Sequence, residues 1–137
     1  MGLSLPPEEL CRQVIGHCMK VHRTLGRGFV EFVYRNALLV EFRKANLQFQ
    51  VEKPMKVLYE GVIVGEFAAD LYVNEWLILE LKAVSALTEE HETKMVNYLT
   101  ALNQDFGLLI NFGAKSLEYK RKYRRRKRPE EPPDLLK

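Results

Sequence analysis

Apolar residues recur at helical spacing over the first third of the chain. A first helix is expected to begin near Pro6-Pro7-Glu8-Glu9, because early prolines and acidic residues suit a helix N-terminus. Its apolar positions are Leu10, Val14, Cys18, Val21 and Leu25. After a break at residues 26–28, a second helix is expected from near Phe29 to about Lys44, with a wide apolar face that predicts deep burial. Glu31 is the odd polar member of that face.

From Leu47 to Lys82 the pattern changes to a period of two, which is typical of strands. Two strands are expected around a break near Pro54, with a turn at Glu60-Gly61. The next segment predicts a hairpin that turns near Asn74-Glu75 and has one core-facing side, because its odd positions are all apolar. These positions are Phe67, Ala69, Leu71, Val73, Leu77, Leu79, Leu81 and Ala83.

The alternation also predicts which polar side chains of the hairpin lie together. If both odd sets face one side, directly opposed residues must have numbers of equal parity. A loop at residues 73–75 achieves this and places Asp70 opposite Ile78 and diagonal to Glu80, with about 7–8 Å between the backbones. Lys82 follows on the same side. Two carboxylates and an ammonium group are therefore expected to project from one face.

The remaining elements complete a mixed α/β pattern. Thr88 suits the N-cap of a third helix, with Glu89 and Glu90 in its first turn. Residues 106–112 are expected to form a buried strand, and a last strand is expected near residues 116–122. The expected order is two helices, three or four strands, one helix and one or two strands. This order predicts a sheet covered by helices.

Neighbouring carboxylates repel each other, and burial makes each charge costlier. A hard divalent cation relieves this repulsion, and Mg²⁺ commonly uses one or two protein carboxylates together with water and substrate phosphate. Asp70 and Glu80 are therefore candidate ligands, and Lys82 is a candidate for holding the attacking water or neutralising charge on a phosphoryl group. Glu31 could add a third carboxylate. The alternative is a surface ion pair between Glu80 and Lys82, worth less than about 1 kcal/mol.

Composition restricts the class of protein. The chain has 137 residues and 47% hydrophobic residues, which suits one domain with an ordinary core. Cys11 and Cys18 are expected to pack as small apolar residues, because their helical spacing is too long for a disulfide and no histidine pattern suggests zinc. No membrane-spanning stretch or signal peptide is evident, so a cytoplasmic location without membrane contact is expected.

Charge is distributed unevenly along the chain. The net charge is only +3, but residues 115–137 hold 10 of the 21 Lys and Arg residues. We therefore expect a domain at residues 1–122 and a disordered tail at residues 123–137, basic at first and then rich in proline and acids. Nucleic-acid contact and a solubilising or localisation role are equally open for the basic run. The candidate contact residues are Lys120, Arg121, Arg124, Arg125 and Arg126.

Several short blocks match, in order, those of a known family of small proteins. The signature Gly-x-x-Glu-x-x-Tyr, which names the family, stands at residues 28–34. The other blocks are Gly65-Glu66-Phe67-Ala68-Ala69-Asp70, Glu80-Leu81-Lys82-Ala83, Asn97-Tyr98-Leu99 and Leu109-Ile110-Asn111-Phe112-Gly113. Over roughly residues 10–122 the chain therefore resembles the GxxExxY family, which is placed in the PD-(D/E)xK nuclease-like superfamily.

The resemblance implies a restriction-endonuclease-like core, in which helices flank a mixed sheet. It also implies an active-site set of Asp70, Glu80 and Lys82, joined by Glu31 from the preceding helix. Asp70 and Glu80 would hold Mg²⁺ or Mn²⁺.

The chain departs from related nucleases on its third helix. These proteins often carry a glutamine one turn before the tyrosine, where this chain has Lys94 before Tyr98. Lys94 could contact phosphate, but an ammonium group cannot accept a hydrogen bond. His91 lies on the same helix and is expected on its surface, although an approach to the cleft stays open.

Three functions remain open from the sequence. The first is a divalent-metal-dependent nuclease that hydrolyses phosphodiesters. The second is a non-catalytic nucleic-acid or protein-interaction module that retains the nuclease fold, and a weaker third is a metal-dependent phosphohydrolase of small nucleotides. Paired acids with a lysine favour the first, since a binding module has no need of carboxylates facing a polyanion. Catalytic activity, substrate type and a homo-oligomeric state are left open.

Overall fold

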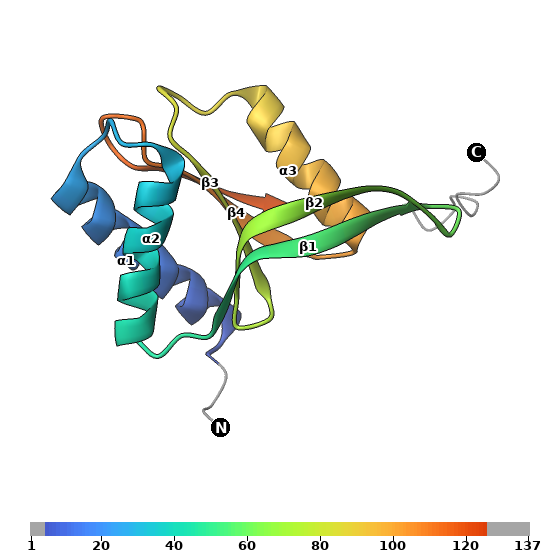
Figure 1. Cartoon of the computed structure of the whole chain (residues 1–137), viewed down its shortest axis with the longest axis horizontal. Coiled ribbons are helices and arrows are strands. Elements are labelled where there is room, and N and C mark those ends of the chain that lie inside the picture. The colour runs from blue at the N-terminus through green and yellow to red at the C-terminus, as the bar shows by residue number, and fades with distance from the viewer. Residues whose placement is uncertain (1–4, 126–137) are drawn as a thin grey trace.

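A computed structural model describes residues 5–125 of the chain (Figure 1). Three helices and five strands follow one another in the order that the hydrophobic pattern predicts. The elements are α1 (Pro7–Leu25), α2 (Glu31–Lys44), β1 (Phe49–Tyr59), β2 (Val62–Val73), β3 (Leu77–Lys82), α3 (Glu89–Leu102), β4 (Phe106–Asn111) and β5 (Glu118–Tyr123).

The strands form one mixed sheet in the order β1-β2-β3-β4-β5. The β3–β4 pair is parallel and the other pairs are antiparallel. Helices α1 and α2 pack with the larger core cluster, and α3 packs with the smaller one through Met95 and Leu99. Figure 1 shows α1 and α2 on one side of the sheet and α3 on the other. The predicted mixed sheet flanked by helices is therefore confirmed.

Helix α1 buries the face that its spacing predicts. Leu10, Val14 and Cys18 are at most 2% exposed. Cys11 and Cys18 are both free and buried, which agrees with apolar packing. Burial raises the pKa of both thiols, so neither is poised to ionise. Among residues 5–125, none of the helices combines the length and hydropathy that crossing a membrane requires.

Helix α2 differs from its predicted position and orientation. It begins at Glu31 rather than near Phe29, and only one side of it is buried. Phe29 and Val40, expected in the core, are about half exposed. The reason is Tyr34, whose hydroxyl donates to the Gly26 carbonyl (2.6 Å) and accepts from the Phe29 N–H (3.2 Å). These bonds turn the Tyr34 side of the helix inward.

The β2–β3 hairpin has the predicted parity but a different register. Val73 lies opposite Leu77 and Tyr72 opposite Ile78, so the pairing is shifted by two residues from the predicted one. The loop is residues 74–76, with Trp76 outside both strands. Trp76 stacks on Phe106 of β4, with ring centroids 5.4 Å apart, and this contact between distant segments favours the observed loop.

The two halves of β2 face opposite sides of the molecule. Leu71 and Val73 pack in the cluster of α1 and α2, whereas Phe67 and Ala69 pack against α3. The expectation that all odd positions share one side was therefore wrong. The β1–β2 ladder has no pair at Glu52 and Asp70, and Glu52 has a φ of 52°. The ribbon twists there, and its outer part extends beyond the body of the molecule (Figure 1).

The elements after the hairpin lie close to their predicted positions. The Thr88 hydroxyl accepts from the His91 N–H at 3.2 Å and caps α3, as predicted. The last strand, β5, ends at Tyr123, one residue beyond the proposed domain boundary at residue 122. The proposed tail is described only as far as Arg125, so the division at this boundary stays a prediction.

Candidate metal and phosphate site

Asp70 and Glu80 occupy the fork where β2 leaves β3. The paired register ends at Leu71 and Leu79, one residue before Asp70 and Glu80 would face each other. The Asp70 N–H instead donates to Glu80 Oε1 at 3.2 Å, and the Leu81 N–H donates to Asp70 Oδ2 at 2.7 Å. Two backbone donors at the fork are thereby satisfied by two carboxylates, which fixes both acidic side chains at the fork, although they line different hollows.

Glu80 and Lys82 line a hollow of about 100 Å³ against α3. Both lie on β3, and the alternation of the strand brings them to the same face. Lys94 and His91 of α3 line the same hollow. His91 Nδ1 accepts from the Thr88 N–H at 3.0 Å, which leaves a proton on Nε2 when the ring is neutral. The Lys94 position is therefore close to the predicted active-site residues.

Asp70 lines a second and wider hollow of about 450 Å³ near the start of α2. Glu31, Phe32 and Arg35 line it from that helix. The Glu31 side chain reaches solvent rather than facing the core, so the expectation of a buried position was wrong. The structure nevertheless brings Glu31 close enough to Asp70 for the two charges to interact.

The electrostatics of the fork disfavour negative charge in the metal-free protein. Burial, together with the Asp70 charge, raises the pKa of Glu80 to about 8, against the opposing effects of the Asp70 N–H and Lys82. Burial also raises the pKa of Asp70, although the hydrogen bond from the Leu81 N–H opposes the shift. Partial burial and the Asp70 charge raise the pKa of Glu31. All three carboxylates would be stabilised by an added cation.

The donor set at the fork fits a magnesium-type ion. Asp70 and Glu80 each use one oxygen for a backbone N–H and retain the other, and oxygen is the ligand that Mg²⁺ prefers. Within residues 5–125, no three His, Cys, Asp or Glu side chains form a group that could hold a metal by themselves. Two carboxylates are sufficient for Mg²⁺, because water and substrate oxygens complete its coordination.

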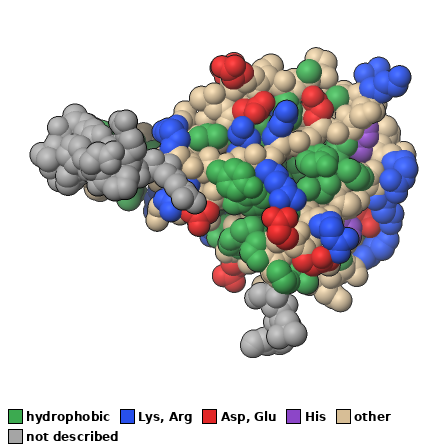
Figure 2. All heavy atoms as spheres, turned by 180° about the vertical axis from the view of Figure 1, so that it is seen from behind, with side chains coloured by type: hydrophobic (Ala, Val, Ile, Leu, Met, Phe, Trp, Pro, Cys, Tyr) green, Lys and Arg blue, Asp and Glu red, His purple; other side chains and the backbone are tan. Residues whose placement is uncertain are grey.

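Of the predicted nucleic-acid contacts within residues 5–125, only Lys94 lines a hollow at the acidic fork. Lys94 lies beside Glu80, whereas Lys120 and Arg121 belong to β5 at the opposite edge of the sheet from β1. Arg121 pairs with Glu8 at 3.0 Å, and Arg124 pairs with Asp105 at 2.7 Å. Arg125 donates to Asn97 at 2.6 Å, and Arg126 lies outside the described residues. On the face in Figure 2, basic side chains in the centre lie next to acidic ones.

Two residues of the wider hollow were not identified from the sequence. Arg35 follows Glu31 by one helical turn, so helical spacing could have indicated it. Its Nη1 donates to Glu52 at 2.7 Å, while its buried Nε has no hydrogen-bond partner in residues 5–125. Phe32 is 57% exposed at the rim of the hollow, a position that apolar patterning does not predict.

Comparison with known proteins supports this assignment of the fold. A model of the PD-(D/E)XK nuclease superfamily matches residues 8–125. The match extends from the first turn of α1 past the end of β5 and includes both sides of the acidic fork. No curated protein sequence and no solved structure matches the chain significantly. The narrower resemblance to the GxxExxY family stays a prediction.

Proposed function

Because this chain belongs to the PD-(D/E)XK nuclease superfamily and has its restriction-endonuclease-like α/β fold, we propose that it is a divalent-metal-dependent nuclease. The observation that carries the proposal is the Asp70–Glu80 fork. Two half-buried carboxylates are held together there, next to Lys82, in a setting that disfavours their negative charges. Perturbed ionisable groups in a hollow are typical of functional sites.

Asp70 and Glu80 would hold Mg²⁺ or Mn²⁺ through the oxygens that the backbone leaves free. The bound ion would act as a Lewis acid and stabilise negative charge on a phosphodiester. Charge neutralisation and substrate orientation would be the roles of the chain's own residues. The Lys82 ammonium group would neutralise charge that develops on the phosphoryl oxygens, and Arg35 and Lys94 would orient the phosphate from the two hollows. Glu31 would position the attacking water or a metal ligand.

Membership of a nuclease superfamily suggests nucleic acid as the substrate. The alternative is a non-catalytic module that retains the nuclease fold. One observation favours it: both carboxylates also hold backbone N–H groups, so a module without activity would have a structural reason to keep them. A structural role of the two carboxylates does not by itself require Lys82. The Lys82 charge opposes the rise in the pKa of Glu80, which lies on the same face of β3.

The test is cleavage of single-stranded and duplex DNA and RNA with Mg²⁺ or Mn²⁺, and with a chelator. Wild type should cleave at least one substrate only with metal, and Glu80→Ala and Lys82→Ala should abolish cleavage. Glu66→Gln is the control, because Glu66 is an exposed acid on β2. Equal activity in all four proteins would overturn the assignment. Binding without cleavage of any substrate would establish the module instead.

A further inference from the structure

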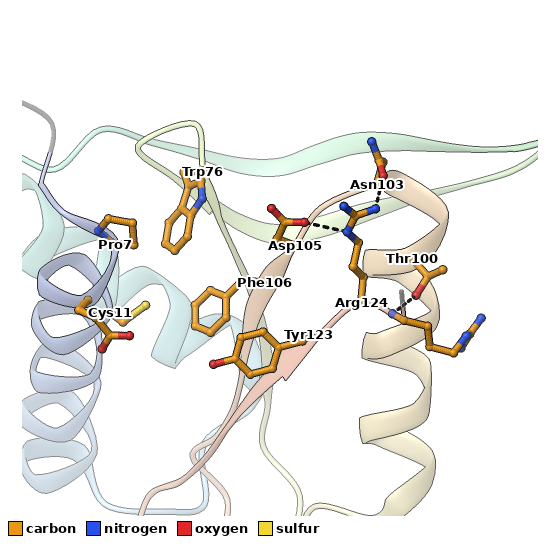
Figure 3. A pocket seen from close by; sticks show the side chains of 11 residues that line it. Pro7, Cys11, Trp76, Thr100, Asn103, Asp105, Phe106, Tyr123 and Arg124 are labelled. Atoms are coloured by element: carbon orange, nitrogen blue, oxygen red, sulfur yellow. Dashed lines mark hydrogen bonds and ion pairs between the residues drawn. The ribbon is translucent and has the colours of Figure 1, made fainter. Parts of the chain in front are cut away.

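A wide hollow lies away from the acidic fork (Figure 3). It has a volume of about 1110 Å³ and shares no lining residue with the two hollows at the fork. It lies at the N-terminal ends of the parallel strands β3 and β4, between α1 and the end of α3. Trp76 precedes Glu80 by four residues on the β3 side, which corresponds to about 13 Å of extended chain.

Three aromatic rings form one wall of this pocket. Trp76 stacks on Phe106 with centroids 5.4 Å apart and planes 19° apart. Tyr123 packs against the other side of the group, 5.2 Å from Phe106. Phe106 is buried, but Tyr123 is 59% exposed and Trp76 is only partly buried. Figure 3 shows the three rings in a row from the β2–β3 turn to β5. Trp76 and Tyr123 thus present exposed aromatic surface to the pocket.

Two arginines stand at the rim in fixed orientations. Arg124 Nε donates to Asp105 at 2.7 Å, and its Nη1 donates to Asn103. Arg125 is anchored by its backbone N–H on Thr100 Oγ1 at 3.0 Å. Each guanidinium has five N–H donors, so donors remain beyond these contacts. The pocket therefore combines an aromatic wall with two arginines, of which Arg124 is paired with Asp105, and Glu8 is a second acidic lining residue.

We propose that this pocket binds an unpaired base of a single-stranded nucleic acid. The base stacks on the exposed faces of Trp76 and Tyr123, and the adjoining phosphate contacts Arg124 and Arg125. Aromatic faces beside cationic groups are the combination that binds single strands, and every base offers a π-face. A paired base cannot enter, because its faces are covered by its neighbours in the duplex. This second site is independent of the catalytic assignment of the fork.

Intrinsic fluorescence reports on the pocket directly, because Trp76 is the only tryptophan of the chain. The full chain is titrated with a short oligodeoxythymidylate and with a duplex of the same length, in chelator so that no cleavage occurs. The single strand should quench Trp76 to saturation, and the duplex should not. Tyr123→Ala should weaken binding by about 5- to 150-fold, the range for loss of one stacked base. Arg125→Ala should reduce the salt slope by about 0.7.

Matched variants separate stacking from folding and from catalysis. Tyr123→Phe keeps the ring and should bind as wild type does. Tyr59→Ala removes another exposed aromatic, at the end of β1, and should have no effect. In Glu80→Gln, the single strand should quench Trp76 fluorescence as in wild type. Loss of cleavage in this variant therefore leaves the inference unaffected. Equal quenching by the duplex, binding without any quenching, no binding at all, or wild-type binding by Tyr123→Ala would each overturn the proposal.

Discussion

The side chains of Asp70 on β2 and Glu80 on β3 each accept a hydrogen bond from the backbone of the other strand. The Glu80 carboxylate accepts the Asp70 N–H, and the Asp70 carboxylate accepts the Leu81 N–H. Both side chains are therefore fixed at the point where β2 and β3 separate, and neither has to be ordered by a ligand. This is the preorganisation that a metal or phosphate site requires.

The same arrangement has an electrostatic cost. Burial and mutual repulsion raise the pKa of Glu80, and burial raises that of Asp70. A structural hydrogen bond alone could be supplied by a neutral acceptor such as asparagine or glutamine. Two carboxyl groups whose charged forms are this costly are better explained by the proposed cation site, because a bound cation would stabilise both charges.

The first prediction concerns pH and the metal-free protein. The Glu80 pKa is about 8 in the folded state, against an ordinary value of 4.5 that applies when the chain unfolds. Between these values the folded protein binds more protons than the unfolded chain. The free energy of unfolding should therefore fall as pH rises through this window. The raised pKa values of Asp70 and Glu31 act in the same direction. Denaturant unfolding in chelator, at pH values from about 5 to about 8.5, measures the trend.

Two variants identify the group responsible for this pH dependence. Glu80→Gln removes the titrating group, so its stability should vary much less over the same range. Glu66→Gln, at an exposed position on β2, should follow wild type. His17, whose pKa burial lowers, acts in the opposite direction in this window, so the comparison with Glu80→Gln decides. A pH dependence of Glu80→Gln equal to that of wild type would contradict the assigned shift.

The features that were predicted correctly depend on local sequence. Thr88 indicated the start of α3, because a cap acts within one turn. Apolar alternation indicated the equal parity of the β2–β3 pairs. That alternation, with the acid-x-Lys spacing, predicted that Asp70, Glu80 and Lys82 project from one face. Glu80 and Lys82 do line one hollow, whereas Asp70 lines the other hollow at the fork.

The features that were missed depend on contacts between distant segments. The two-residue register shift reflects the stacking of Trp76 on Phe106, and these residues are 30 positions apart in the sequence. The rotation of α2 reflects Tyr34, which hydrogen bonds Gly26 and stacks on Phe112 at 4.7 Å. Local pattern carries no information about such partners, so the pocket around Trp76 could not be predicted.

The second prediction separates the charge of Asp70 from its hydrogen bond. Asp70→Asn retains an acceptor for the Leu81 N–H but removes one of the repelling charges. Without metal, this variant should melt at or above the temperature of wild type. Asp70→Ala leaves the Leu81 N–H without its partner and should lose about 1–3 kcal/mol of stability. Thermal melts in chelator compare the three proteins.

The metal response completes this test. Ion bound only to the folded state adds about 2.7 kcal/mol at a hundredfold excess over its dissociation constant, which is a shift of several degrees for a domain of this size. Wild type should show this shift with Mg²⁺ or Mn²⁺, and Asp70→Asn should lose most of it. If wild type does not respond to the ion and Asp70→Asn is strongly destabilised, Asp70 has only a structural role.

The third prediction concerns Arg35, which lines the hollow of Asp70 and has an unpartnered Nε. If the Arg35 guanidinium contacts substrate phosphate, Arg35→Ala should lower kcat/KM by about 10- to 100-fold, the value of a hydrogen bond to a charged group. The loss should appear mainly as a higher KM. Arg35→Lys keeps the charge without the planar fork and should recover only part of the activity.

Arg35 also pairs with Glu52, so a structural explanation needs its own control. Glu52→Gln removes the ion pair but leaves the guanidinium in place, and its KM should stay at or below that of wild type. If Glu52→Gln reproduces the effect of Arg35→Ala, the ion pair supports the loop and Arg35 does not bind substrate.

The fourth prediction concerns the basic C-terminal run. Residues 118–123 form β5, which pairs with β4, so a deletion that begins at residue 120 would damage the sheet. A deletion of residues 126–137 leaves β5 and the contacts of Arg124 and Arg125 intact. It removes three consecutive basic residues, Arg126, Lys127 and Arg128. If all three contact duplex phosphates, the slope of log affinity against log salt should become shallower by about 2.7, at about 0.9 for each contact.

The matched comparison is Arg124→Ala in the full chain. This variant removes a single cation from residues 5–125 and leaves residues 126–137 in place. Fluorescence anisotropy with labelled duplex, measured over a range of salt concentrations, gives the slope for each protein. A shallower slope with an unchanged melting temperature assigns the run to nucleic-acid contact. An unchanged slope would mean that residues 126–128 do not contact phosphate, and a solubilising or localisation role would then explain the basic run.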